Sequence, residues 1–270
     1  MHQLQPQWKQ FKSGTDIRGV ASEGAPGQEI NLTDEAVGRM TDGFLLWLSR
    51  RAGKPCRELS VSIGHDSRIS APRLKAAVIQ RMTAAGCRVY DCGLSSTPAM
   101  FQTTRTLPCD GAVQLTASHH PFYRNGLKFF TPDGGLDGPD IEEILFAAQE
   151  ESHPDGASDG QIIPTDFMKE YAAGLRQMIR DGVGGERPLE GFHIVVDAGN
   201  GAGGFYAGEV LAPLGADVSG SRYLDPDGMF PNHIPNPEDR DAMASIREAV
   251  LESKADLGVI FDTDVDRAGC

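Results

Sequence analysis

Residues 111–121 read GAVQLTASHHP, an apolar run that passes into a polar loop. The run from Gly111 to Leu115 predicts a buried strand, and the loop that follows it carries Ser118. A serine just past a strand is a common position for a nucleophile, because the scaffold holds the loop while the loop exposes the hydroxyl. Taken alone, the loop is equally consistent with hydroxyl groups that only satisfy the backbone of a turn.

Strand and helix patterns alternate on both sides of this loop, which predicts an α/β layer architecture. Thr33 is a good N-cap for a helix that Gly53 ends, and Ser70 is expected to cap the next helix. A last helix opens at Glu238. We expect strands at residues 59–63, 88–91, 111–115, 127–130, 193–197, 216–219 and 257–261, and further helices at residues 97–107, 140–149, 165–180 and 205–214.

The segment 151–160 holds Ser, Pro, Asp and Gly and few apolar residues, which is typical of a linker between domains. The sequence therefore predicts two α/β domains, at residues 1–160 and 161–270.

The bulk composition excludes several classes of protein. The net charge is −13 and no basic run is present, which argues against nucleic-acid binding but not against an anionic substrate. The five cysteines are odd in number and show no paired CxxC spacing, so we expect neither a disulfide framework nor a zinc site. No signal-peptide pattern and no apolar run of about 18 residues is apparent, so we expect a cytoplasmic protein without a membrane segment.

Three aspartates alternate near the end of the chain, at Asp262, Asp264 and Asp266. Alternate residues of an extended segment point the same way, and three carboxylates on one side repel one another unless a cation lies among them. Oxygen ligands favour a hard cation such as Mg²⁺ or Mn²⁺ over zinc. An EF-hand loop begins similarly, but its sixth residue is glycine, where this chain has Arg267. A solvated acidic loop remains the alternative.

The glycine-rich stretch 199–204 fits GxGxxG, the dinucleotide-binding pattern, and Asp225 could serve as its ribose partner. However, Asp225 lies in a loop rich in Pro and Gly rather than at the end of a second strand. We interpret the glycines as a tight strand-to-helix turn, and keep a dinucleotide-dependent oxidoreductase as an alternative.

Taken together and in order, the motifs of this chain resemble those of the α-D-phosphohexomutase family, which includes phosphoglucomutases, phosphomannomutases and phosphoglucosamine mutases. The motifs are GTDIRG (14–19), GHDSR (64–68), TASHHP (116–121), GLKFF (126–130), DAGNGAGG (197–204), FPNHIPNPE (230–238) and DTDVDR (262–267). The resemblance implies two consecutive α/β/α three-layer domains with mixed sheets. It also implies that the chain corresponds to the first two domains of a family whose members normally have two more.

The resemblance implies an isomerase of the intramolecular phosphotransferase type. Such an enzyme moves a phosphoryl group between the 1- and 6-positions of a hexose phosphate, through a phosphoserine and a bisphosphate intermediate. By resemblance, Ser118 carries the phosphate and completes the Mg²⁺ site of Asp262, Asp264 and Asp266. Hexose 1,6-bisphosphate is the implied activator.

The resemblance also assigns roles to other residues. Lys128 is the expected general acid/base, His119 helps to arrange the site, and Arg18 contacts phosphate or the reacting oxygen. Fixed positive groups must converge on a site that holds so many carboxylates and phosphates. The remaining expected contacts to the substrate and its phosphate come from Thr15, Arg68 and Arg267.

Three positions depart from the family pattern. His65 stands where members often have Arg, and Thr263 and Val265 replace glycines of the metal loop. β-Branched residues resist positive φ, so the backbone conformation of this loop is open. A phosphosugar- or metal-binding module without turnover is a further alternative.

Overall fold

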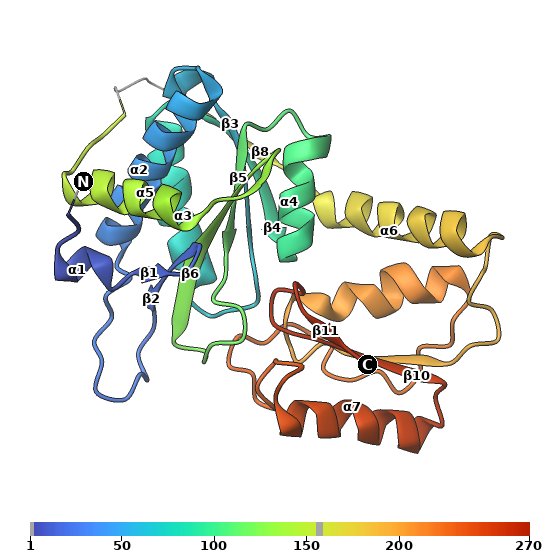
Figure 1. Ribbon diagram of the computed structural model, residues 1–270. Helices are drawn as coiled ribbons and strands as arrows, with labels where there is room; N and C mark the ends of the chain where they lie inside the picture. Colours follow the sequence, from blue (N-terminus) through green and yellow to red (C-terminus); the bar gives the residue numbers. More distant parts are fainter. Residues whose placement is uncertain (1–2, 155–158) are drawn as a thin grey trace. The chain divides into compact units, whose positions relative to one another are not determined.

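A computed structural model describes residues 3–154 and 159–270, and these form two compact units (Figure 1). The first unit takes in residues up to 65, then 69–93 and 100–165; the second takes in 66–68, 94–99 and 166–270. Residues 155–158 of the expected linker lie outside the described residues. The units are therefore not consecutive in sequence, because two short segments of the N-terminal half belong to the second unit. A domain boundary at residue 160 stays a prediction.

The first unit is built on one mixed sheet in the order β1-β2-β6-β5-β3-β4-β8, with β7 paired to β6. Strand β5 is parallel to β3 and antiparallel to β6. The strands are β1 (Lys12–Ser13), β2 (Asp16–Val20), β3 (Ser60–His65), β4 (Arg88–Leu94), β5 (Gly111–Leu115), β6 (Arg124–Thr131), β7 (Gly134–Gly135) and β8 (Gln161–Pro164). The helical elements between residues 6 and 149 are α1 (Pro6–Lys9), α2 (Asp34–Ala52), η1 (Cys56–Glu58), α3 (Ala71–Ala84), α4 (Thr97–Thr106) and α5 (Gly138–Gln149).

Helices cover both faces of this sheet, as two adjacent residues of β6 demonstrate. Phe129 stacks on Phe44 of α2, with ring centroids 4.4 Å apart, whereas Phe130 packs on Phe101 of α4 at 5.8 Å. Successive side chains of a strand point to opposite faces. Helices α2 and α4 therefore lie on opposite sides of the sheet, and α3 and α5 join α2 on its side (Figure 1). This is the expected three-layer arrangement.

The second unit has a smaller mixed sheet in the order β11-β10-β9, with β9 (Ile194–Asp197) parallel and β11 (Ala268–Gly269) antiparallel to β10 (Leu257–Phe261). Alternation again separates the two faces. Val195 and Ile260 pack with α7 (Arg240–Ser253), whereas Val196 packs with the π-helix η3 (Tyr206–Leu211). The other helical elements are α6 (Phe167–Val183), η2 (Ala202–Gly204) and η4 (Ala212–Leu214). The predicted α/β class with mixed sheets is confirmed.

Local signals define most elements correctly. Thr33 Oγ1 accepts a hydrogen bond from the Ala36 amide, and Gly53 closes α2 at φ 66°. At α3, Ser70 is the N-cap residue, as expected, but it does not cap through its side chain. Its hydroxyl accepts a hydrogen bond from Asn125 Nδ2 at 2.9 Å, and among the described residues it makes no capping bond.

Three other expectations need correction. Residues 216–219 were expected to form a strand, but among these described residues only Asp217 makes a single bridge, to His193. The helix expected at 205–214 is a π-helix followed by a 3₁₀ turn, and α7 is capped by Asp239 rather than opened by Glu238. Strand β8 was not expected, because its short QIIP sequence lies in a polar stretch at the edge of the sheet.

Across residues 3–154 and 159–270, none of the helices combines the length and the apolar character that crossing a membrane would require.

Candidate active site

Ser118 lies in the loop between β5 and β6, in a backbone conformation that is rare for a residue with a side chain. Its φ is 50°, in the left-handed region. The Ser118 amide donates to Thr116 Oγ1 at 2.9 Å, and the His120 amide donates to the Ala117 carbonyl at 3.1 Å. These bonds hold a tight turn around the serine. Strained backbone of this kind concentrates at functional sites.

The two histidines that follow Ser118 stack on each other. The ring centroids of His119 and His120 are 4.9 Å apart with planes inclined by 28°, and both residues are half-buried. His119 follows the predicted nucleophile directly and lies in the same turn.

Lys128 lies on β6, opposite the fully buried Gln114 of β5. The residue is half-buried. The Thr116 amide of the serine loop donates to the Gly126 carbonyl at 3.2 Å, two residues before Lys128. The backbone of the serine loop is thus hydrogen-bonded to β6, the strand that carries Lys128.

Arg18 lies on β2, paired with Gly126 of β6. A Cβ at Gly126 would come within 2.2 Å of the Ile17 carbonyl, so only glycine lets β2 approach β6 this closely. Arg18 forms an ion pair with Asp16 at 2.7 Å, but its Nε is buried and has no hydrogen-bond partner within the described part of the chain. A buried N–H without an acceptor is costly, and an anion would satisfy it. Thr15 is exposed in the turn before β2.

The three predicted metal ligands meet at the end of β10. Ligand oxygens of Asp262, Asp264 and Asp266 lie within 4.8 Å of one another. Asp262 and Asp264 are fully buried, and Asp266 is exposed. Buried carboxylates that crowd together repel strongly without a counter-charge. The donor set, made of oxygens alone, fits a hard divalent cation.

Thr97 is a contact of this cluster that the sequence reasoning missed. Its hydroxyl donates to Asp264 Oδ2 at 2.5 Å, and its amide donates to the Asp264 carbonyl at 2.8 Å. Thr97 belongs to segment 94–99, which is part of the second unit. No spacing in the sequence links residues 97 and 264, so only the fold reveals the pair.

The backbone conformation of Val265 shows how the metal loop folds where the family pattern has glycine. Its φ is 66°, so a β-branched residue occupies the left-handed conformation that glycine takes more readily. The turn closes with the Val265 amide donating to the Asp262 carbonyl at 3.2 Å. Valine therefore keeps the conformation that glycine would allow, at the cost of backbone strain.

The glycine-rich turn 199–204 packs against this same metal loop. The Ala202 amide donates to the Thr263 carbonyl at 2.8 Å, and a Cβ at Gly201 would lie 2.6 Å from that oxygen. A Cβ at Gly204 would lie 2.0 Å from the Leu224 carbonyl. These glycines bring protein backbones together, which supports the interpretation as a tight turn over that as a dinucleotide site.

Arg267 and Arg68 occupy different surroundings within the second unit. Arg267 is partly exposed and donates to Asp262 through Nε at 3.2 Å, while its Nη2 lies 3.1 Å from the same carboxylate. The side chain of Arg68 is fully buried, paired with Asp66 at 3.1 Å and packed over the ring of Phe230 at 5.3 Å. Arg68 therefore supports the loop that contains Phe230.

Three of the buried cysteines do not compete with Ser118 as nucleophiles. Burial raises the pKa of the Cys87, Cys92 and Cys109 thiols to about 12. A thiol with so high a pKa stays protonated near neutral pH and is a poor nucleophile.

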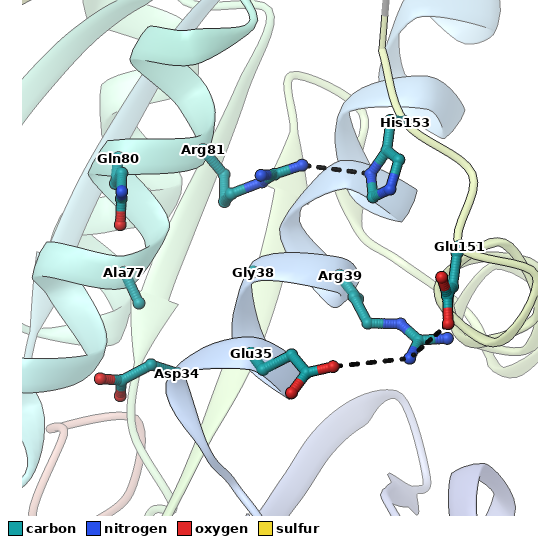
Figure 2. A pocket seen from close by; sticks show the side chains of 9 residues that line it. All are labelled: Asp34, Glu35, Gly38, Arg39, Ala77, Gln80, Arg81, Glu151 and His153. Carbon is teal, nitrogen blue, oxygen red and sulfur yellow. Dashed lines mark hydrogen bonds and ion pairs between the residues drawn. The ribbon is translucent and has the colours of Figure 1, made fainter.

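A hollow of about 380 Å³ lies between α2, α3 and residues 151–153 in the first unit (Figure 2). Its lining includes none of the predicted site residues. Arg39 is paired with Glu151 at 3.2 Å, and Arg81 lies 3.1 Å from His153 Nδ1. Its charges largely neutralise one another, so we do not assign the active site to it.

Comparison with known families agrees with the resemblance. The family model described as phosphoglucomutase/phosphomannomutase, alpha/beta/alpha domain I, matches residues 9–154, and domain II of the same family matches residues 169–270. The predicted family is thereby confirmed.

Individual relatives are about twice as long as this chain. A phosphomannomutase/phosphoglucomutase of Pseudomonas aeruginosa is 31% identical over 254 residues, which cover 94% of this chain and 50% of that protein. A phosphoglucosamine mutase of Pediococcus pentosaceus is 33% identical over 263 residues, 94% of this chain and 54% of that protein. A solved phosphoglucomutase/phosphomannomutase family protein from Burkholderia thailandensis superposes with a TM-score of 0.77 at 26% identity, covering 98% of this chain and 55% of that chain. The chain thus spans about half the length of the curated relatives that it matches.

Proposed function

The chain belongs to the phosphoglucomutase/phosphomannomutase family, and we propose that it functions in a hexose-phosphate mutase. Such an enzyme moves a phosphoryl group between the 1- and 6-positions of the sugar. The observation that carries this proposal is Ser118, held at φ 50° in a short loop between β5 and β6. A non-glycine residue in this conformation is strained, and the loop that maintains it also carries His119 and is hydrogen-bonded to Gly126, two residues before Lys128. The relatives named above act, by their names, on phosphorylated mannose, glucose or glucosamine.

In the proposed reaction, phosphorylated Ser118 gives its phosphoryl group to the free hydroxyl of a hexose monophosphate. The bond between phosphorus and the serine oxygen breaks, a bond to the sugar oxygen forms, and the sugar hydroxyl loses its proton to a base. Lys128 is the proposed acid/base that takes this proton and returns it. In the second half, Ser118 accepts the phosphoryl group from the other end of the hexose 1,6-bisphosphate. Positioning and charge neutralisation supply most of the catalysis in such transfers.

Asp262, Asp264 and Asp266 are the proposed ligands of a magnesium ion, with phosphorylated Ser118 as the fourth. Carboxylate oxygens within 4.8 Å of one another fit this assignment. When bound, Mg²⁺ supplies positive charge that neutralises phosphate and polarises it toward attack.

Positive side chains are the proposed phosphate contacts. The buried Nε of Arg18 offers an N–H that has no acceptor among the described residues, and it fits a phosphate oxygen. Arg267, adjacent to Asp266 and partly exposed, is the second proposed contact, and Thr15 is the third. The side chain of Arg68 is fully buried and contacts Asp66 and Phe230, so we propose that it supports the loop that contains Phe230.

The proposal is tested by incubating the chain with Mg²⁺ and glucose or mannose 1,6-bisphosphate, followed by peptide mass spectrometry. We expect one phosphate, on Ser118, and none after Ser118→Ala, whereas Ser152→Ala should label like the parent. Ser118 is buried, so labelling requires the loop to open, and the reaction should be followed over hours. Phosphate on another hydroxyl, or none at saturating bisphosphate, would contradict the donor role and favour a binding module without turnover.

A further inference from the structure

His233 is enclosed in the loop 225–239, in the motif FPNHIPNPE, which the proposed reaction does not use. Its side chain is only 4% exposed. Ring Nδ1 lies 2.9 Å from the Ile234 carbonyl, and Nε2 lies 3.0 and 3.1 Å from the two oxygens of Asp197. A carbonyl and a carboxylate accept hydrogen bonds and do not donate them. This geometry favours an imidazolium, in which both ring nitrogens donate, paired with a buried carboxylate.

Asp197 anchors this cation to the core of the second unit. It ends β9, is fully buried, and also accepts hydrogen bonds from the Gly199 amide at 2.9 Å and from Ser245 Oγ of α7 at 2.6 Å. Three donors from three parts of the chain thus meet on one carboxylate. Charge-assisted hydrogen bonds of this kind are stronger than neutral ones.

The same loop lies tightly against the glycine-rich turn. Asn232 Nδ2 donates to Asn200 Oδ1 at 2.7 Å, and a Cβ at Gly199 would lie 2.8 Å from Pro235. The ring of Tyr223 meets His233 edge-on, with centroids 5.5 Å apart. The loop has little room to shift while the ion pair is intact.

The far end of the loop reaches Arg267. Nη1 of Arg267 donates to Asn236 Oδ1 at 3.4 Å and lies 3.9 Å from Glu238. The other guanidinium nitrogens of Arg267 contact Asp262. Arg267 is therefore held between the metal loop on one side and the His233 loop on the other.

We propose that His233 is a positioning residue. Its ion pair with Asp197, which we call the latch, holds residues 230–238 against β9 and so fixes the position of the Arg267 guanidinium. Raising the pH removes the proton, weakens the latch and frees the loop. The effect on catalysis rests on the proposed role of Arg267 as a phosphate contact, but the latch itself does not.

The direction of the pH dependence follows from the groups around the ring. Burial by itself lowers the pKa of His233, but the hydrogen bonds to Asp197 and to the Ile234 carbonyl, with the charges of Asp197 and Asp239, raise it above its ordinary value of 6.5. A raised pKa in the folded state means that the latch is fully formed below about pH 6.5 and is lost as the pH rises through the folded-state pKa.

The test needs no substrate. Heteronuclear NMR of the ¹⁵N-labelled chain, titrated from about pH 5.5 to 9, reports the protonation of each imidazole ring. We expect His233 to keep both ring protons to a pH above its ordinary pKa of 6.5. His193, at the opposite end of β9, is the matched position for a control substitution. A neutral His233 ring throughout the range would overturn the proposal without any mutation.

Hydrogen–deuterium exchange supplies the second readout. After correction for intrinsic rates, residues 225–239 should exchange roughly tenfold faster in His233→Gln than in the parent, as expected for losing a hydrogen bond to a charged group. The parent should lose protection as the pH rises, His233→Gln should show no such step, and His193→Gln should follow the parent. Equal protection in the parent and His233→Gln would also overturn the proposal. Neither readout depends on phosphorylation of Ser118, so a failure of the proposed function would be seen separately.

Discussion

Asp264 is a proposed metal ligand and, without metal, an expected source of instability. It is fully buried with Asp262 nearby, and Thr97 Oγ1 donates to it. Like charges in a buried site destabilise the folded protein until a cation compensates them. The proposed metal ligands should therefore oppose folding in the absence of metal.

Asp264→Asn should separate these two effects. Asn keeps an oxygen for the Thr97 hydroxyl but removes the charge, so we expect a higher melting temperature without metal. The stabilisation by Mg²⁺, about 2.7 kcal/mol for the parent at a concentration of 100 Kd, should be lost. Calorimetry at several Mg²⁺ concentrations measures both. The exposed Asp181→Asn is the control, and equal Mg²⁺ affinity in the parent and Asp264→Asn would remove Asp264 from the site.

The second prediction concerns backbone strain at Val265. Valine at φ 66° should cost about 1–2 kcal/mol relative to an ordinary conformation. Val265→Gly relieves this strain but also removes packing, so Val265→Ala is needed as the reference. We expect Gly to be more stable than Ala at this position by about 1 kcal/mol in urea denaturation.

The control for Val265 is Val259 on β10, which is partly buried against the same core cluster. In the extended backbone of a strand, the Gly variant should be less stable than the Ala variant, by roughly 0.5–1 kcal/mol. If the order at Val265 matched the order at Val259, the left-handed conformation would carry no strain and this account of Val265 would be wrong.

Among the larger elements, the glycine-rich turn determines where the metal loop lies. Gly201→Ala should push the Thr263 backbone outward, because the new Cβ would lie 2.6 Å from its carbonyl oxygen. We expect a loss of about 1–3 kcal/mol in stability and weaker Mg²⁺ binding. Chemical denaturation and calorimetry check the two effects.

Gly208→Ala is the matched control, since it lies in the π-helix η3 with nothing within 4 Å of a new Cβ. It should be neutral or slightly stabilising, because alanine restricts the unfolded chain. Should Gly201→Ala bind Mg²⁺ as tightly as Gly208→Ala, the close packing of turn and loop would have no bearing on the metal site.

The elements that sequence could predict are those with strong local signals. Thr33, Gly53 and the apolar run at 257–261 define their elements directly, because capping and strand alternation are local effects. Ser70 does not cap α3 through its side chain, because its hydroxyl is used by Asn125, which is 55 residues away. Strand β8 was missed because an edge strand need not be apolar. At the candidate site, the aspartates were visible as a motif, whereas Thr97 was not, because its partner lies 167 residues further on.

At the scale of the whole molecule, each unit carries residues proposed for the reaction. Ser118, Lys128 and Arg18 belong to the first, and the aspartate cluster and Arg267 to the second. The net charge is −13, so the proposed phosphate contacts are local positive groups in an acidic protein. The family models account for two domains, whereas the curated relatives are about twice as long.

From this follows the last prediction: a polypeptide of these 270 residues should bind Mg²⁺ but turn over poorly by itself. The bisphosphate must be retained while its orientation reverses, so that each end meets Ser118 in turn. Positioning can contribute about 7–11 kcal/mol to a reaction, and binding energy from the remote phosphate is normally used for it. If the other half of the relatives' length contributes that binding, its absence lowers kcat and raises KM together.

The measurement is a coupled assay that detects glucose 6-phosphate formed from glucose 1-phosphate, with Mg²⁺ and glucose 1,6-bisphosphate present. Ser118→Ala defines the background rate, and a relative of full length provides the positive control. We expect a rate that exceeds the background only slightly, while calorimetry of the same sample still detects Mg²⁺ binding. Turnover in the usual enzyme range of roughly 1–10³ per second would show that two domains suffice, and that the placement of the remote phosphate does not depend on residues outside this chain.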